Sequence, residues 1–273
     1  MDEPPQSFFE RHEFLLRRLH SASGLVPVGA YMVVHLATNS LVLEGPAAFQ
    51  KSVYSIHALG GLLPIVEWVF IFIPLLFHAL YGVAIVAGAV PNTTHYPYLA
   101  NRRYNWQRWS GMIAFVFIFW HVFHMHGWFH TEWWIVHVAE PFGGFKFRPY
   151  NAASSAGLAL QDISYIVFYA VGVLACVYHL ANGIWTAGIT WGIWVSERAQ
   201  SRALSVCGIF GILLAVVGLG ALGGMWKVGR GEALEQAIEV EDKMYEHRLS
   251  RGELTPDEHK RTAPPTAVNE KTE

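Results

Sequence analysis

Five long apolar segments constrain this chain more than any other feature of its sequence. A helix needs about 20 apolar residues to cross the hydrocarbon core of a bilayer, and every segment meets that length. The segments are residues 22–43, 62–90, 109–127, 163–194 and 203–226. Charged residues make up only 15% of the chain, against roughly 25% in soluble domains. We therefore predict an all-α integral membrane bundle of five transmembrane helices.

The segments divide the chain into residues 1–21 before the bundle, 22–226 within it and 227–273 after it. Arginines concentrate before the first segment and in the second and fourth connections. Because cytoplasmic loops carry an excess of Lys and Arg, we predict a cytoplasmic N-terminus and a polar C-terminal tail outside. Outside the bundle we predict an interfacial helix at 47–59. In the tail we predict an exposed helix at 232–248 and disorder at 262–273.

Four histidines lie deep in the first four segments, one in each. They are His35, His78, His121 and His179. An ionisable ring in hydrocarbon is costly and is a functional hypothesis by default, and imidazole is a standard axial ligand of haem iron. One such histidine alone is explained as readily by a hydrogen bond to a neighbouring helix. Four of them, at matched depths, favour two haems b with two histidine ligands each.

The rise of a helix sets the depth of each histidine. At about 1.5 Å per residue, His35 and His121 lie about 21–22 Å from the cytoplasmic ends of their helices, in the outer half of the membrane. His78 and His179 lie about 21–24 Å from the outer ends of helices that run the opposite way. These depths predict an outer haem between the first two histidines and an inner haem between the other two.

Glycines accompany the histidines in a repeating pattern. Gly82 and Gly183 each follow a histidine by four residues, and residues four apart share a helix face. We predict that they clear that face for a macrocycle. Gly24 and Gly111 stand earlier in the first and third segments, so the chain shows a loose two-helix repeat with a fifth helix added. Close helix packing is an equally good explanation for any one of these glycines.

Other polar residues are candidates for proton transfer and for cofactor binding. Glu67 is the lone carboxylate within the second segment, about 16 Å above the histidine of that segment and level with the outer pair. Since apolar surroundings favour the protonated form of a carboxyl group, we predict that Glu67 is a proton donor; an interface-facing glutamate is the alternative. Donors at the cytoplasmic ends of the first and third segments suit anionic haem propionates, although the positive charge usual on that side explains part of the pattern. These donors are Arg17, Arg18, His20, Ser21, Gln107 and Arg108.

Short motifs recur through the segments in a fixed order. They are RRLHS at 17–21, PVG at 27–29, HL at 35–36, PLLFHALYG at 74–82, QR at 107–108, WHV at 120–122, HLANGIW at 179–185 and TWG at 190–192. This order resembles the di-haem cytochrome b subunits of succinate:quinone oxidoreductase, and most closely the cytochrome b558 type of Gram-positive bacteria with a single five-helix anchor. The resemblance covers about residues 13–225 and spans all five segments.

The resemblance implies that the four histidines ligate two haems b in the pairing given above. It also implies a bacterial inner (cytoplasmic) membrane, an iron–sulfur subunit facing the inner haem, and a flavoprotein subunit bound to it. Electrons would pass between succinate and a membrane quinone, here menaquinone. A related fumarate reductase has a glutamate for transmembrane proton transfer two residues before its fourth-helix ligand. This chain has Val177 there, so the resemblance does not extend to that route.

Several other functions are less consistent with the sequence. The chain has no flavin-binding glycine motif and no Cys spacing for an iron–sulfur cluster, so a dicarboxylate site would lie on a partner subunit. The net charge of −2 excludes a nucleic-acid-binding protein, which would be basic. A di-haem anchor of a hydrogenase or formate dehydrogenase is the alternative function, and a structural membrane protein without cofactor is another.

A second group of histidines follows His121 at the end of the third segment. Histidine boxes also hold di-iron in membrane desaturases, but such sites need several boxes on the cytoplasmic face, and here there is one at an outer end. We therefore predict that His124, His126, His130 and His137 are outer-surface residues.

Overall fold

The structure is a computed structural model that describes residues 11–89 and 97–262. Every regular element in these residues is an α-, 3-10 or π-helix, as the all-α prediction requires. The chain divides into two compact units. The first comprises residues 1–34, 64–115 and 174–214, and the second comprises 35–63, 116–173 and 215–273.

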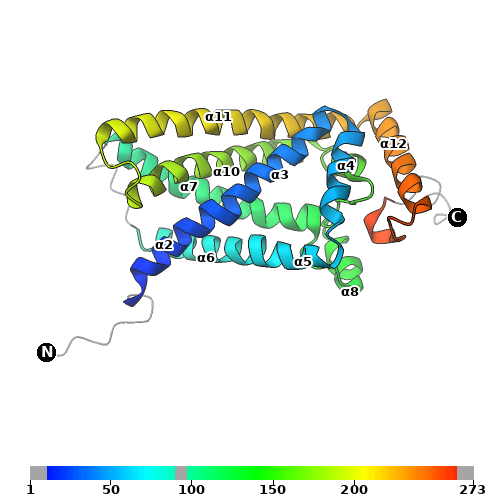
Figure 1. The fold of residues 1–273 in the computed structure, drawn as a ribbon, viewed down its shortest axis with the longest axis horizontal. Helices are drawn as coiled ribbons and strands as arrows, with labels where there is room; N and C mark the ends of the chain where they lie inside the picture. Colours follow the sequence, from blue (N-terminus) through cyan, green and yellow to red (C-terminus); the bar gives the residue numbers. More distant parts are fainter. Residues whose placement is uncertain (1–10, 90–96, 263–273) are drawn as a thin grey trace. The chain divides into compact units, whose positions relative to one another are not determined.

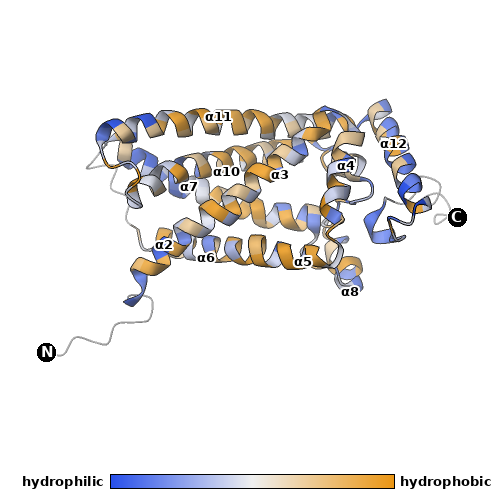
Figure 2. Ribbon diagram, in the orientation of Figure 1, coloured by the Kyte–Doolittle hydropathy of each residue, from blue (hydrophilic) through white to orange (hydrophobic). Residues whose placement is uncertain are grey.

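Among the described residues, five helical spans are long and apolar enough to cross a membrane, and Figure 2 shows the apolar residues that dominate them. They are Glu13–Leu43, Gly60–Ala87, Leu99–His126, Ile163–Thr190 and Glu197–Val228. Such helices suit a bilayer because each satisfies its backbone hydrogen bonds internally. The first, third and fifth spans begin six to ten residues earlier than predicted. The residues added at these three starts include arginines, which escape a hydropathy criterion, although Arg, Gln and Glu favour helix formation.

The first two spans each contain a π-helical segment. The first span consists of α2 (Glu13–Ser23), η1 (Gly24–Gly29), α3 (Ala30–Ser40) and η2 (Leu41–Leu43). The second consists of η3 (Gly60–Leu62), α5 (Leu63–Val66), η4 (Glu67–Phe72) and α6 (Ile73–Ala87). Pro27 lies inside η1, where its missing N–H removes one helical hydrogen bond and favours a local change of helix type. Within the first unit, α2 and η1 pack against α6, and η1 also contacts η4.

The remaining spans are more regular. The third is α7 (Leu99–His121), which continues as the π-helical η5 (Val122–His126). It ends at Gly127, whose φ of 81° is the left-handed conformation that glycine adopts readily at helix C-termini. The fourth and fifth spans are single helices, α10 (Ile163–Thr190) and α11 (Glu197–Val228).

Several shorter elements of the second unit lie outside the spans. They are α4 (Pro46–His57), α8 (Glu132–Trp134), η6 (Ile135–Ala139), α9 (Ala152–Ala159), α12 (Gly231–Ser250) and η7 (Glu258–Lys260). In this unit α12 packs against α4 and α9, and Figure 1 shows α4 and α12 side by side. The helices predicted at 47–59 and 232–248 are therefore confirmed as helices.

The predicted exposure of the C-terminal helix is wrong for one of its faces. Ala237 and Glu241 of α12 are fully buried, and Tyr245 is 5% exposed. These residues are four apart and share one face, which the many charges of the segment obscure in the sequence. Residues 263–273, for which we predicted disorder from Thr262 onwards, lie outside the described residues.

Glu241 anchors α12 to the N-terminus of α9. Its carboxyl oxygens accept hydrogen bonds from the backbone N–H groups of Ala153 (2.6 Å) and Ser154 (3.3 Å) and from the Ser154 hydroxyl. The first N–H groups of a helix have no partner within it, so Glu241 satisfies donors that would otherwise be buried and unpaired. Burial raises the pKa of Glu241 to about 7 despite these hydrogen bonds.

Candidate functional site

The first unit brings together His78 of α6 and His179 of α10. Their ring centroids are 6.0 Å apart, and the ring planes are 80° from parallel. A metal–imidazole bond is about 2.0 Å long, so two rings bound to one metal from opposite sides have centroids roughly 6 Å apart. The spacing of this inner pair therefore fits a single iron between the rings.

The second unit brings together His35 of α3 and His121 of α7. Their ring centroids are 5.9 Å apart with an angle of 70° between the planes, so this outer pair has the same spacing as the inner one. Helix rise alone predicted the same two pairs. Ligation of haem by these histidines stays a prediction.

The inner histidines are oriented by two backbone carbonyls. Nδ1 of His78 lies 2.9 Å from the carbonyl oxygen of His20, and Nδ1 of His179 lies 3.0 Å from that of Gln107. A carbonyl oxygen only accepts, so each Nδ1 must carry the proton. In a neutral imidazole the lone pair is then on Nε2, which is the atom left to bind a metal.

Two serines that the sequence analysis missed stand in equivalent places on the first and third spans. The Ser23 hydroxyl donates to the carbonyl of His20 (3.0 Å), and the Ser110 hydroxyl donates to the carbonyl of Gln107 (3.1 Å). Each serine follows the carbonyl residue by three positions and precedes a glycine, so a Ser-Gly pair repeated in both spans is the signal that would have identified them.

The glycines of these two pairs make room for the inner histidines. A Cβ atom at Gly24 would lie 2.3 Å from Cε1 of His78, and one at Gly111 would lie 2.8 Å from Cε1 of His179. Real Cβ contacts are essentially never this short. The two glycines stand on the spans that carry the outer histidines, but they serve the inner pair.

The glycines that follow the inner histidines lie beside the side chains of His20 and Gln107, the two residues whose carbonyls orient those histidines. A Cβ at Gly82 would be 3.1 Å from Nε2 of His20, and one at Gly183 would be 3.4 Å from Nε2 of Gln107. The loose repeat predicted from the sequence is therefore visible in the contacts of the first unit. In both halves, one span supplies a backbone carbonyl and a glycine to the histidine of the next span, and the glycine after that histidine lies beside the residue that supplies the carbonyl.

Two of the six residues predicted to bind propionates contact the inner pair directly. The His20 ring stacks on the His78 ring at 4.2 Å and is within 5° of parallel. The Gln107 side chain donates to the carbonyl of His179 (3.0 Å) and accepts from the amide of Asn182 (2.7 Å). The side chains of His20 and Gln107 therefore contact the inner histidines themselves.

The predicted donors of the first span other than His20 make different contacts. Arg17 forms an exposed ion pair with Glu13 at 2.7 Å. The guanidinium of Arg18 lies 4.9 Å from the ring centroid of Trp191, whose indole N–H donates to the Ser21 hydroxyl at 3.2 Å. These contacts involve other protein groups, so a role toward propionates stays a prediction for these residues.

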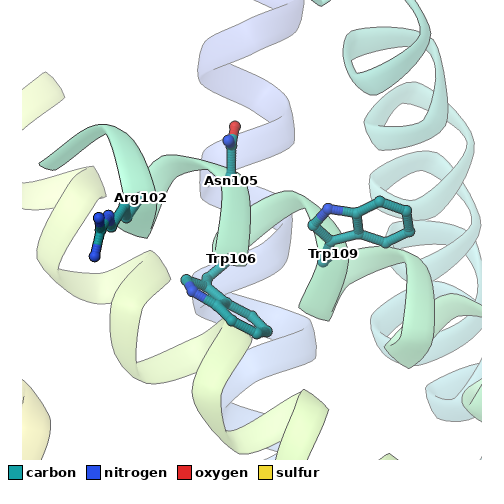
Figure 3. Close-up of a pocket in the computed structure, with 4 residues that line it drawn as sticks. All are labelled: Arg102, Asn105, Trp106 and Trp109. Atoms are coloured by element: carbon teal, nitrogen blue, oxygen red, sulfur yellow. The ribbon is translucent and has the colours of Figure 1, made fainter. Parts of the chain in front are cut away.

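The N-terminal part of α7 carries the last predicted donor and a surface hollow. Arg108 donates to the Tyr104 hydroxyl, and its guanidinium lies 3.8 Å from the centroid of that ring. The hollow has a volume of about 440 Å³, and Figure 3 shows its lining side chains spreading apart along α7. They are Arg102, Asn105, Trp106 and Trp109. It contains none of the predicted ligands.

The outer histidine of α7 belongs to a buried hydrogen-bonded group. The Tyr169 hydroxyl of α10 lies 3.3 Å from Nδ1 of His121 and 2.7 Å from Nδ1 of His124. His124 is only 1% exposed, so its prediction as an outer-surface residue is wrong. Residues three apart share a helix face, which turns His124 toward α10 together with His121.

Phe117 completes the packing around the outer histidine. Its ring stacks on the His121 ring with centroids 5.5 Å apart and an angle of 22°. A Cβ at Gly172 of α10 would lie 2.1 Å from Cγ of Phe117, so this glycine allows α10 to approach. The sequence analysis considered neither residue.

Comparison with known proteins supplies the family. The chain is 34% identical over 210 residues to the succinate dehydrogenase cytochrome b558 subunit of Bacillus subtilis (strain 168), which covers 77% of this chain and 96% of the relative. The chain belongs to the succinate dehydrogenase cytochrome b558 subunit family. No family model matches it. The resemblance inferred from motifs is thereby confirmed, and together with the five apolar spans it makes the chain a multi-pass membrane protein.

Glu67 of this cytochrome b558 family member begins η4 in the first unit. It is half-buried, whereas Val66 and Trp68 on either side of it are exposed. Tyr31 of α3 lies within electrostatic range of its carboxyl group, in agreement with the contact between η1 and η4. Glu67 therefore points toward the first span, and its position beside the outer pair stays a prediction.

Proposed function

We propose that this chain is the membrane anchor and cytochrome b subunit of a succinate:quinone oxidoreductase and binds two haems b. The observation that carries the proposal is the presence of two separate histidine pairs with ring centroids 6.0 and 5.9 Å apart. The family relationship supports the same function, because the relative is named as a succinate dehydrogenase subunit. It also favours this function over the hydrogenase or formate dehydrogenase alternative.

The residues of the inner pair fit a haem. Both Nδ1–H groups donate to carbonyl oxygens, which leaves Nε2 of His78 and of His179 to bind iron. Gly24 and Gly111 keep side chains away from the two rings. When bound, the haem would supply one-electron transfer at a potential that its ligands and their hydrogen bonds adjust.

The chain itself would hold and position the electron carriers, while partners oxidise the dicarboxylate. A flavoprotein subunit and an iron–sulfur subunit would dock at the cytoplasmic side, where α2 and α7 carry their arginines. The N-terminus would then be cytoplasmic and the membrane would be the bacterial inner membrane. The substrate within the membrane would be a quinone, menaquinone by the resemblance.

Substitution of each histidine tests the ligand assignment. We expect His35→Ala and His121→Ala to remove one component of the reduced-minus-oxidised spectrum, and His78→Ala and His179→Ala to remove the other. His137→Ala is a suitable control, because its exposed ring bonds the carbonyl of Trp133 and stacks on the Trp133 ring, and neither contact involves a predicted ligand. Loss of the same component from the His35 and His78 variants would contradict the pairing.

Glu67 would supply protons for quinone chemistry, which requires two protons for each two electrons. We expect Glu67→Gln to retain both haems and succinate oxidation with a dye that accepts electrons before the haems, but to slow turnover with quinone. Glu44→Gln, which changes an exposed carboxylate, is the matched control. Quinone turnover equal to that of the parent would reject the proton role and leave the interface-facing alternative.

Purification of the complex separates the candidate functions. Copurification of a flavoprotein with succinate-linked activity supports the proposed function. Copurification of a hydrogenase or formate dehydrogenase subunit would replace it with the alternative, and a preparation without haem absorbance would leave only a structural role.

A further inference from the structure

A tyrosine hydroxyl joins two histidines beside the outer pair. The Tyr169 oxygen is 2.7 Å from Nδ1 of His124 and 3.3 Å from Nδ1 of His121. Tyr169 is 5% exposed and His124 is 1% exposed. This buried group lies within the second unit and is not needed for the ligand assignment.

The direction of these hydrogen bonds follows from the tautomer that a ligand histidine must adopt. A phenol has one O–H donor, and a neutral imidazole has one donor and one acceptor nitrogen. A His121 that binds metal through Nε2 carries its proton on Nδ1, so Nδ1–H of His121 donates to the phenol oxygen. The Tyr169 O–H is then free to donate to Nδ1 of His124, the nearer of the two nitrogens.

The inner pair differs in the kind of group that accepts its protons. There both acceptors are backbone carbonyls, those of His20 and Gln107, and no side-chain substitution removes them. At His121 the acceptor is a side chain with a second histidine behind it. The Ser110 hydroxyl also lies 3.4 Å from Nδ1 of His179, but the nearer Gln107 carbonyl stays in place when that hydroxyl is removed. The outer site, in contrast, loses the acceptor of His121 together with the Tyr169 hydroxyl.

We propose that Tyr169 positions the His121 ring and, supported by His124, lowers the reduction potential of the haem that His121 binds. The inference rests on the proposed function in one respect, namely that His121 is an axial ligand. A hydrogen bond accepted from Nδ1–H makes the ligand more basic, which stabilises ferric relative to ferrous iron. His124 adds to this, because hydrogen bonds in a chain polarise one another.

Redox titration of both spectral components in the purified complex tests the proposal. Tyr169→Phe removes the acceptor but keeps the ring. We expect the ferrous-to-ferric ratio of the outer component to rise about three- to tenfold at a fixed ambient potential, which is the usual effect of losing one hydrogen bond on an equilibrium. A tenfold change corresponds to about 59 mV for a one-electron couple. The inner component should be unchanged and serves as an internal control.

A double-mutant cycle tests whether His124 acts through Tyr169. We expect His124→Leu to shift the outer component in the same direction by a smaller factor, and to cause no further shift when Tyr169→Phe is already present. Tyr165→Phe is the matched control. Its ring stacks on His124 with centroids 4.6 Å apart, and the substitution preserves that ring, so both potentials should stay as in the parent.

Other results would overturn the proposal. Unchanged potentials in Tyr169→Phe with both haems retained would refute it and leave the ligand assignment intact. If Tyr169→Phe loses the outer haem, Tyr169→Gln decides, since its amide can still accept a hydrogen bond. Retention in that variant supports the hydrogen bond, whereas loss in both shows that Tyr169 acts only by filling space. A His121→Ala variant that keeps both haems would instead refute the proposed function.

Discussion

Gly24→Ala tests whether the inner histidine is held as tightly as the contacts indicate. The new Cβ would lie 2.3 Å from Cε1 and 2.5 Å from Nδ1 of His78, whereas carbon atoms in contact prefer about 3.5–4.0 Å. The ring must therefore retreat by roughly 1 Å, which breaks its 2.9 Å hydrogen bond to the His20 carbonyl. Overpacking costs about 1–3 kcal/mol and the lost hydrogen bond about 0.5–1.5 kcal/mol. The inner site should therefore be destabilised by about 2–4 kcal/mol.

At about 1.4 kcal/mol per factor of ten, this loss weakens binding of the inner haem by roughly 30-fold to several hundred-fold. The assay is the haem content of purified protein together with the reduced-minus-oxidised spectrum, which should retain the outer component and lose the inner one. Gly208→Ala is the control, because a Cβ there meets no atom within 4 Å. A Gly24→Ala protein with two haems and an unchanged spectrum would refute the reasoning.

Three further substitutions have defined outcomes. Gly111→Ala should weaken the inner haem less than Gly24→Ala does, because its Cβ would lie 2.8 Å from His179; equal or greater haem loss would contradict this. Gln107→Leu removes the side-chain bonds to His179 and Asn182 but keeps the backbone carbonyl at position 107 that orients His179. The inner haem should therefore still bind, but it should be lost at a lower temperature when the protein is heated. Glu241 has a pKa raised to about 7, so the docking of α12 is most stable below the ordinary glutamate pKa and loses roughly 3 kcal/mol as the pH rises to about 7. Limited proteolysis of α12 should therefore be faster at about pH 8 than at about pH 5, and Glu241→Gln should abolish the difference.

Hydropathy and helix rise predict much of this fold. The five spans follow from the length of the apolar segments, and the two histidine pairs follow from the depth of each ring in a helix of known rise. These quantities are local, since they depend only on positions along one segment. The early start of α7 at Leu99 was not predicted, because a helix continues through polar residues beyond the membrane.

The contacts that orient the histidines depend on tertiary structure. Tyr169 is 48 positions from His121 in the sequence, and Glu241 is 88 positions from Ala153. No local periodicity relates residues so far apart. The burial of His124 was missed for the same reason, because a histidine at the end of a span looks like a surface residue until its partner on α10 is known.

The haem-to-protein ratio tests the central claim most directly. Pyridine haemochrome absorbance of the purified chain, divided by its protein content from amino-acid analysis, counts the haems b that each chain binds. Two histidine pairs, each with a spacing that fits one iron, predict a ratio of two. A ratio of one or zero in a folded, fully loaded preparation would contradict the assignment of His35, His78, His121 and His179 as ligands of two haems.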